Sequence, residues 1–522
     1  ELMSFPDVVA GAFEQLAKVA VAEHVGKTTE GHAPGLSGRG LQAYLAAGVA
    51  DDHEVRILDL RLEKGLEASL ESFRPDIVGI TAYTVHVNPV RALFDRVKAW
   101  NPEALTVVGG HHATVVPEDF VSPSIDLIVL GEGVPAFREI VRRREKGEGF
   151  DGIPGLAFAR SDHLIRTEYA LAVDLDALPT PRRDLTAANR QHYFSEWGRP
   201  LASIRTSKGC PFRCRFCALW KLTGGRYLRR KPERIVEELA GLKEDFVFFA
   251  DDESLVDAPR MRRLADLISQ AGVRKRYFLY GRSDTIAAHP DLLARWKEIG
   301  LERVFVGLEF CRQEGLAFVG KRSTVQDNAR AVEILLSLGI DVYASLIVRP
   351  SFRRDDFATL RAYCRDLGLA LATFPVLTPL PGTDLYEEVH GEMITHNYDL
   401  FDFIHALLPT RLPLDEFYGE LCRLYTSAIP FQKRLTHLRK YRLSCAGISV
   451  SCDKCGVRTW TTTTTEAVWR SANPGSRPHG RREANSAAFA APTQHALRNL
   501  KCQKQRWCSP RHVNSSPYEP VE

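Results

Sequence analysis

The sequence lacks an uninterrupted apolar run long enough to cross a membrane. Hydrophobic residues make up 44% of the 522 residues, yet no apolar stretch of about 18 residues is free of charged side chains. The first residues also lack the basic segment and apolar core of a secretion signal. We therefore expect a cytoplasmic protein, or one that contacts the inner membrane peripherally.

Most of the chain, residues 1–430, has no excess of positive charge. Residues 431–522 carry 16 Lys and Arg against 5 Asp and Glu, whereas residues 1–430 carry 53 against 60. Proteins that bind nucleic acid need a basic face for the phosphates. The acidic body therefore argues against nucleic acid as a partner. A basic tail can instead contact anionic lipid.

No repeat of fixed period is visible, but strands alternate with helices in two successive series. The first series has expected strands at residues 55–60, 76–81, 105–110 and 126–131, and helices at 66–73 and 89–100. This alternation is typical of a parallel, doubly wound sheet. An opening strand before residue 40 is not recognisable. We assign residues 1–150 to a flavodoxin-like (Rossmann-type) α/β domain.

The second series has six strands joined by five helices. The expected strands are 201–206, 246–250, 277–280, 304–308, 342–347 and 373–377, and the helices are 232–242, 259–270, 290–299, 325–338 and 355–367. This pattern predicts a partial (βα)6 TIM-type barrel. The boundaries we expect are a linker at 151–195, the barrel at 196–385, a small C-terminal helical region at 386–440, and a disordered, low-complexity tail at 441–522.

Three cysteines, Cys210, Cys214 and Cys217, lie within eight residues directly after the first barrel strand. Without a secretion signal, such a cluster favours metal ligation over disulfides. Three thiolates on one loop suit a [4Fe-4S] cluster, whose fourth iron stays open to another ligand. Zinc normally requires paired CxxC units or added histidines, and no second pair lies nearby. Buried structural thiols are the remaining alternative.

This spacing, with the aromatic Phe216 before the final cysteine, resembles the radical S-adenosylmethionine (SAM) superfamily. The resemblance implies that Cys210, Cys214 and Cys217 are metal ligands and catalytic, and that Phe216 belongs to the cofactor site. It further implies that SAM binds the open iron and is cleaved to a 5′-deoxyadenosyl radical. The electron would come from a donor such as a flavodoxin or ferredoxin.

Three polar residues follow the second, third and fourth barrel strands, namely Asp251, Arg282 and Glu309. The carboxyl ends of barrel strands meet at one mouth, where active sites form. The resemblance implies that these residues bind SAM, with Arg282 paired to its carboxylate. Each of them is alternatively a solvated charge at the end of a strand.

The first domain resembles the cobalamin-binding domain of B12-dependent radical SAM enzymes. Glycine at a strand end lets a corrin or a nucleotide tail approach the backbone closely, although any flavodoxin-like domain also has such turns. The residues that we assign to cobalamin binding are Gly109, Gly110, His111, Gly131, Glu132 and Gly133. Val134 replaces the final acid of the family's G-E-G-E element. His53 is a decoy for the lower axial ligand of cobalt, because it precedes a strand and lacks the following glycine.

Segments 218–221, 377–386, 401–413 and 416–418 resemble the hopanoid C-3 methylases. This resemblance implies methylation of an unactivated carbon, C-3 of a hopanoid, by a 5′-deoxyadenosyl radical and methylcobalamin. Apolar residues of 386–430 would then line an entrance for the triterpenoid lipid, or form a simple helical lid. The alternatives are another B12-dependent radical SAM enzyme (a different methylation substrate or an anaerobic oxidative cyclisation), a radical SAM enzyme that no longer uses cobalamin, and an iron–sulfur protein without enzyme activity.

Overall fold

The computed structural model describes residues 18–23, by their backbone, and residues 43–429 except 61, 64, 161–162, 170, 172 and 194–196. The tail expected at 441–522 and the last part of the expected region 386–440 lie outside the described residues.

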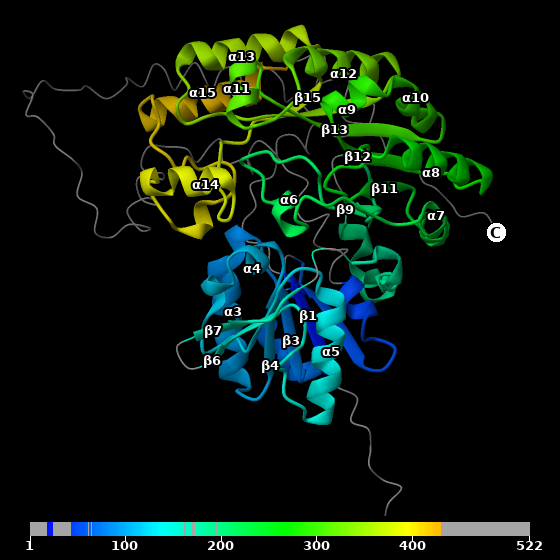
Figure 1. The fold of residues 1–522 in the computed structure, drawn as a ribbon, viewed down its shortest axis with the longest axis vertical. Coiled ribbons are helices and arrows are strands. Elements are labelled where there is room, and N and C mark those ends of the chain that lie inside the picture. Colours follow the sequence, from blue (N-terminus) through cyan, green and yellow to red (C-terminus); the bar gives the residue numbers. More distant parts are fainter. Residues whose placement is uncertain are drawn as a thin grey trace, which may run out of the picture. The chain divides into compact units, whose positions relative to one another are not determined.

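A seven-stranded sheet forms the first part of the chain (Figure 1). Its strands are β1 Lys18–Glu23, β2 Glu54–Asp59, β3 Ile77–Thr81, β4 Leu105–Gly109, β5 Leu127–Val129, β6 Leu156–Arg160 and β7 His163–Arg166. The order is β2-β1-β3-β4-β5-β6-β7, with β1 to β5 parallel and β6 and β7 antiparallel. The parallel part has the flavodoxin-like order, in which ligands bind beyond the carboxyl ends of the strands.

Strand β1 is the opening strand that the sequence does not reveal. It pairs in parallel with β2 on one side and with β3 on the other. Its V-A-V-A core between Lys18 and Glu23 is a short run of small or β-branched residues, and such a run does not distinguish a strand from a helix. Its presence completes the order on which the ligand site depends.

Both faces of this sheet are buried under helices. Val78 and Ile80 of β3 pack into one hydrophobic cluster, whereas Ile77 packs into another on the opposite face. Side chains alternate along a strand, so two-sided burial produces the continuous apolar runs that predicted these strands. The helices of this part are α2 Leu66–Phe73, α3 Val87–Trp100, α4 His111–Val115 and α5 Gly133–Lys146. Figure 1 shows α3 and α5 on opposite sides of the sheet.

The second sheet is the predicted partial barrel. Its strands are β8 Leu201–Ile204, β11 Phe246–Phe249, β12 Arg276–Arg282, β13 Leu301–Glu309, β14 Asp341–Leu346 and β15 Leu371–Thr373, all parallel to their neighbours. The order β15-β14-β13-β12-β11-β8 leaves β8 and β15 as edges. The helices are α7 Pro232–Gly241, α8 Ala258–Gln270, α9 Ser283–Ala288, α10 Pro290–Glu298, α11 Gln313–Phe318, α12 Val325–Ser337 and α13 Arg354–Asp366. The fold class expected from the sequence is confirmed.

Aromatic side chains fill the inner face of the barrel. The ring centroids of Phe248 and Phe278 lie 5.1 Å apart, and those of Tyr280 and Phe305 lie 4.8 Å apart. Phe248 and Phe278 are almost fully buried in this cluster. The inner face of the barrel is therefore a packed core, and in such barrels ligands bind at the mouth.

The C-terminal region caps the barrel and also contacts the first domain. Helices α14 Asp384–Val389 and α15 Leu414–Ser427 flank an irregular stretch. Phe417 of α15 is buried against the outer core of the barrel. The hydroxyl of Tyr398 donates a 2.7 Å hydrogen bond to Asp119, which lies between β4 and β5. The segment thus links the two sheets.

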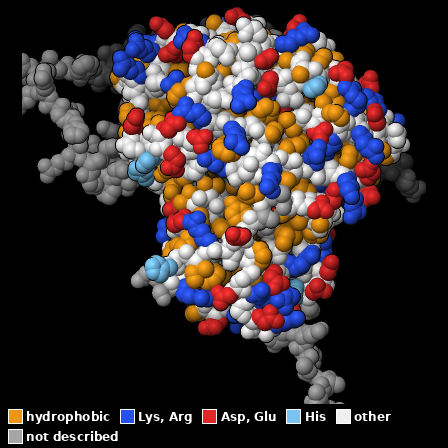
Figure 2. Space-filling model, viewed as in Figure 1, with side chains coloured by type: hydrophobic (Ala, Val, Ile, Leu, Met, Phe, Trp, Pro, Cys, Tyr) orange, Lys and Arg blue, Asp and Glu red, His pale blue; other side chains and the backbone are white. Residues whose placement is uncertain are grey.

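The surface of the described part is mixed in charge. Figure 2 shows Lys and Arg side chains interspersed with Asp and Glu on the face that it presents. Among the residues that the structure describes, no helix is both long and apolar enough to span a bilayer.

We predict that the aromatic core of the barrel carries much of its stability. Replacing Phe248 with Ala leaves a cavity and should lower the free energy of unfolding by about 3–5 kcal/mol. The control is Leu336→Ala, because this side chain on α12 is 41% exposed, and it should cost less than about 0.5 kcal/mol. Urea titration measures both, and equal costs would contradict the packing described.

Candidate active site at the cysteine loop and the glycine-lined cavity

The three cysteines lie on a loop at the mouth of the barrel. The chain leaves β8 and passes through β9 Ser207–Lys208 into the loop, and the antiparallel partner of β9, β10 Leu228–Arg229, follows the loop. Gly209 opens the loop with φ +87, where a Cβ atom would lie 2.2 Å from the carbonyl oxygen of Arg226. Only glycine fits this close approach. The short α6 Leu219–Leu222 follows the loop.

Hydrogen bonds hold the loop in shape. The amide of Arg215 donates to the carbonyl of Val319 (2.9 Å), and the carbonyl of Arg215 accepts from the amide of Leu385 (3.0 Å). The indole of Trp220 donates to the carbonyl of Cys214 (3.3 Å). The loop is therefore anchored to α11, to α14 and to its own following helix, so the thiols are positioned by backbone contacts.

The thiols themselves are suited to ligate a cluster. Burial raises the pKa of Cys210 to about 11 and that of Cys217 to about 12, so binding iron must displace their protons. Within the described residues, no three His, Cys, Asp or Glu side chains converge on one metal ion. In a cubane cluster three thiolates would bind three separate irons, so cluster ligation does not require the three sulfur atoms to converge on one ion.

Arg282 lies beside the cysteine loop at the mouth of the barrel. Its Nη1 is 3.7 Å from the sulfur of Cys214, and its guanidinium lies over the ring of Phe212. Its Nε and Nη2 donate to the two oxygens of Asp284, at 3.0 and 2.8 Å. The guanidinium therefore supplies positive charge at the loop, and its forked edge is already occupied by a carboxylate.

Three acidic residues, 251–253, follow β11, and the first of them holds the backbone before the cysteine loop. Both carboxylate oxygens of Asp251 accept hydrogen bonds, from the amide (2.6 Å) and hydroxyl (2.5 Å) of Thr206 and from the amide of Ser207 (2.9 Å). Asp251 thus fixes the segment that leads into the cysteine loop.

The two neighbouring acids were not singled out from the sequence. Asp252 accepts from the amide of Gly209 (2.6 Å) and lines the cavity described below. Glu253 accepts from the amides of Arg282 (3.2 Å) and Val256 (2.6 Å), and burial raises its pKa to about 7. Period-two alternation ends with the strand, so the sequence did not indicate which acid faces the mouth.

Glu309 ends β13 in a strained backbone conformation. Its φ of +58 is in the left-handed region, which costs a non-glycine residue about 1 kcal/mol or more. Its carboxylate pairs with the buried Lys321 (2.9 Å), whose amine also donates to the carbonyl of Gly307 (2.5 Å). The pairing register with β14 shifts at this point. The strain lies at the barrel mouth, where strained residues are often functional.

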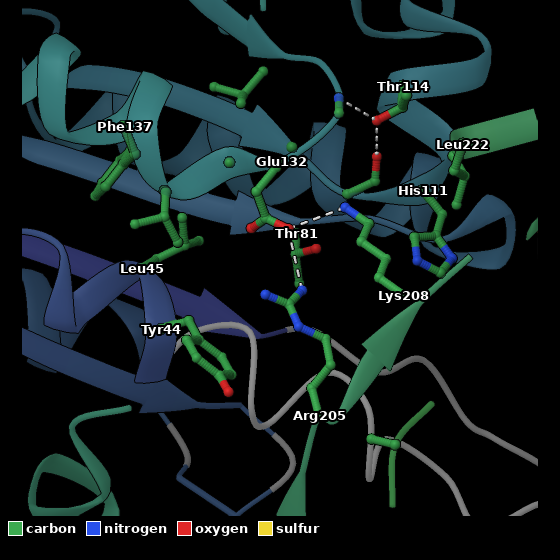
Figure 3. A pocket seen from close by; sticks show the side chains of 18 of the residues that line it. Tyr44, Leu45, Thr81, His111, Thr114, Glu132, Phe137, Arg205, Lys208 and Leu222 are labelled. Atoms are coloured by element: carbon green, nitrogen blue, oxygen red, sulfur yellow. Dashed lines mark hydrogen bonds and ion pairs between the residues drawn. The ribbon is translucent and has the colours of Figure 1, made fainter. Parts of the chain in front are cut away.

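A cavity lies between the strand ends of the first sheet and the segment before the cysteine loop (Figure 3). One part of its wall is apolar, with Leu45, Val107 and Phe137, and another part carries Arg205 and Lys208. All six residues that we assigned to cobalamin line it, namely Gly109, Gly110, His111, Gly131, Glu132 and Gly133. His53 is not among its lining residues, in keeping with its rejection.

Two of these glycines are required by the backbone. Gly110 has φ +105, and a Cβ atom there would lie 2.5 Å from the hydroxyl of Thr81. Gly131 has φ +77, and its Cβ would lie 2.6 Å from the ring of Tyr169. Together with Gly109 and Gly133 they present bare backbone at the strand ends, which fits the close approach of a large cofactor.

His111 faces the cavity as a neutral imidazole. Its ring packs edge-to-face against Tyr83, with centroids 4.8 Å apart. Burial, aided by the charge of Lys208, lowers its pKa to about 4. The ring is therefore uncharged at physiological pH and able to act as an acceptor.

Glu132 connects the cavity to the cysteine loop. One of its carboxylate oxygens accepts from both Lys208 (3.0 Å) and Arg205 (3.2 Å), as Figure 3 shows. These two cations lower the pKa of Glu132 despite its burial. Arg205 and Lys208 were not predicted as site residues. The only sequence signal for them is their position just before the cysteine cluster.

Comparison with known proteins agrees with this arrangement. Residues 36–141 match the B12 binding domain, and residues 204–364 match the Radical SAM superfamily. The chain is 33% identical over 389 residues to the hopanoid C-3 methylase of Methylococcus capsulatus, covering 73% of this chain and 74% of that protein. It is 26% identical over 405 residues to the anaerobic magnesium-protoporphyrin IX monomethyl ester cyclase of Rubrivivax gelatinosus, covering 73% and 72%.

Among solved structures, the chain is similar to the cobalamin-dependent SAM radical enzyme OxsB with aqua-cobalamin and SAM bound. The TM-score is 0.62 at 16% identity, covering 79% of this chain and 67% of that one. At this identity, the likeness shows a shared fold.

The strand-end glycines give a first prediction for the site. Gly110→Ala should lower the free energy of unfolding by at least about 2 kcal/mol, because of left-handed strain and the clash with Thr81. The matched control is Gly147→Ala after α5, where φ is +66 but nothing lies within 4 Å. It should cost only about 1 kcal/mol. Equal midpoints in urea would contradict a steric requirement at Gly110.

The lowered pKa of His111 predicts an acid-sensitive contribution to stability. Between pH 6.5 and 4 the unfolded state binds a proton that the folded state does not, so stability falls as the pH falls through this window. From pH 7.5 to 5 the parent protein should lose up to about 2 kcal/mol more than His111→Gln. Urea unfolding of the cofactor-free proteins measures this difference, and identical pH profiles would show that the imidazole titrates normally.

Proposed function

We propose that this enzyme acts on a pentacyclic triterpenoid lipid and methylates C-3 of a hopanoid. The chain belongs to the B12-dependent radical SAM methyltransferases. The enzyme uses a [4Fe-4S] cluster, SAM and cobalamin. When bound, these groups supply hydrogen abstraction by a carbon radical and a transferable methyl group. The 33% identity to a hopanoid C-3 methylase over most of both chains carries the choice of substrate.

The placement of the two sites supports a reaction that needs both. A ring carbon of a triterpenoid is not nucleophilic, so polar methyl transfer from SAM has no attacking electron pair. Hydrogen must be removed first, and the methyl group must then reach the same carbon. Arg205 and Lys208 line the glycine-bordered cavity, and Cys210 follows two residues after Lys208. This short connection supports a substrate position between the sites.

The chain's own groups have distinct roles in this proposal. Cys210, Cys214 and Cys217 hold the cluster, and Arg282 supplies positive charge beside Cys214. Asp252, Glu253 and Glu309 are the acids at the mouth that we assign to SAM, whereas Asp251 positions the loop. Phe216 packs against the apolar cluster around Phe310 and Leu377, and we assign it to the wall of the SAM site.

The C-terminal region is the proposed route for the lipid. Much of it is packed inward, since Phe401 and Leu407 are buried, so it acts as a cap. Ile394, Phe403 and Leu414 remain more than a third exposed and offer an apolar surface to a lipid. The proposal includes peripheral contact with the membrane that holds the substrate and a flavodoxin or ferredoxin as electron donor.

Loss of a single ligand should abolish the radical step. Cys214→Ala should drop the iron content of reconstituted protein and reduce 5′-deoxyadenosine formation from SAM to background. The control is Cys364→Ala, because this buried cysteine lies on α13 away from the loop, and it should retain both. Iron analysis and mass spectrometry decide, and SAM cleavage retained in Cys214→Ala would refute the cluster assignment.

The substrate is tested by an anaerobic assay with reconstituted enzyme, cobalamin, SAM and a strong reductant. With diplopterol we expect methylated lipid together with 5′-deoxyadenosine and S-adenosylhomocysteine. A parallel reaction with magnesium-protoporphyrin IX monomethyl ester should give no new product. Cyclised porphyrin instead of methylated lipid would move the enzyme to the cyclase activity of its more distant relative.

A further inference from the structure

Arg205 lies over the ring of Tyr44, and one edge of its guanidinium has no hydrogen-bond partner among the described residues. Its Nη1 donates to Glu132, but Nε and Nη2 are buried without a hydrogen-bond partner among the described residues. The side chain is only 11% exposed. A buried, unpaired donor costs about 1–3 kcal/mol, and two of them on one charged group suggest a missing ligand.

The empty edge is the one that binds oxyanions elsewhere in this protein. Nε and Nη2 of Arg276 hold the two oxygens of Glu302, both at 2.6 Å. The same two nitrogens of Arg282 hold the two oxygens of Asp284. These N–H bonds are parallel and match a carboxylate or phosphate bidentately.

The surroundings of Arg205 favour an anionic group attached to an apolar one. The cavity continues from Arg205 and Lys208 to a slot lined by Leu45, Val107 and Phe137. The acids at this cavity are engaged, since Glu132 is shared between the two cations and Asp252 accepts from Gly209. A ligand with an aromatic base and an oxyanion a few bonds away matches both parts.

We propose that Arg205, through Nε and Nη2, receives the phosphodiester of the nucleotide loop of cobalamin. The inference rests on the proposed function only in that cobalamin occupies this cavity. Arg205 is one of the residues that line this cavity, so an oxyanion entering the cavity meets its guanidinium. Arg205 lies five residues before Cys210, and Asp251 fixes the intervening Thr206 and Ser207. Binding of the phosphodiester therefore ties the cofactor to the cysteine loop.

The test compares three corrinoids on the full-length, cluster-free protein. Cobalamin has the phosphodiester, cobinamide phosphate keeps a phosphate but lacks the base, and cobinamide has neither. Affinities come from absorbance titration. The parent protein should bind cobinamide phosphate about 10- to 100-fold more tightly than cobinamide, and Arg205→Gln should bind the two with equal affinity. Arg205→Lys, which keeps the charge without the fork, should recover only part of the difference.

The controls separate the competing outcomes. Arg142→Gln removes an exposed arginine of α5 and should leave all three affinities unchanged. Equal losses for all three corrinoids in Arg205→Gln would make Arg205 merely structural and overturn the proposal. SAM binding is also measured on cluster-loaded, cobalamin-free Arg205→Gln. If SAM binding is weakened while corrinoid binding is intact, the free edge binds the SAM carboxylate, and the proposal is overturned. Failure of the parent to bind any corrinoid would instead refute the cobalamin site itself.

Discussion

The arrangement of the site depends on one interaction, in which the carboxylate of Glu132 accepts hydrogen bonds from both Lys208 and Arg205. Glu132 belongs to the strand-end turn of the first sheet, and the two cations belong to the segment that enters the cysteine loop. All three side chains are largely buried, so a partner left alone would keep an uncompensated charge at a cost of several kcal/mol. The pairing therefore holds the glycine-lined cavity against the cysteine loop.

Around this contact, each sheet contributes a different kind of rigidity. The first sheet presents glycines whose positive φ values leave bare backbone at the cavity. The barrel contributes a floor of packed aromatic rings, so that its polar groups act only at the mouth. Asp251 accepts hydrogen bonds from Thr206 and Ser207 on both carboxylate oxygens, which fixes the approach to Cys210. Both cofactor sites thus lie at carboxyl ends of parallel strands.

Much of this follows from the sequence because its signals are strong and local. The three cysteines, the alternating strands and helices, and the paired strand-end glycines each indicate their element directly. Strand β1 was not recognised because a V-A-V-A run has no distinctive period, and only pairing with β2 and β3 defines it. Arg205 and Lys208 became site residues through their contacts with Glu132 across the two sheets, which no spacing along the chain encodes. The roles given to Asp251 and Asp252 depended on hydrogen bonds, since the sequence places them side by side.

In the proposed reaction, both sites act on one substrate in one turnover. The most direct measurement loads the reconstituted enzyme with cobalamin carrying a carbon-13 methyl group, adds unlabelled SAM, reductant and diplopterol, and follows the isotope in the methylated lipid. If the methyl group passes through cobalamin, the first turnover should yield carbon-13 product in proportion to the loaded cobalamin, with unlabelled product following. Unlabelled methyl groups in the first turnover would contradict this route, because the methyl group would then bypass the cavity.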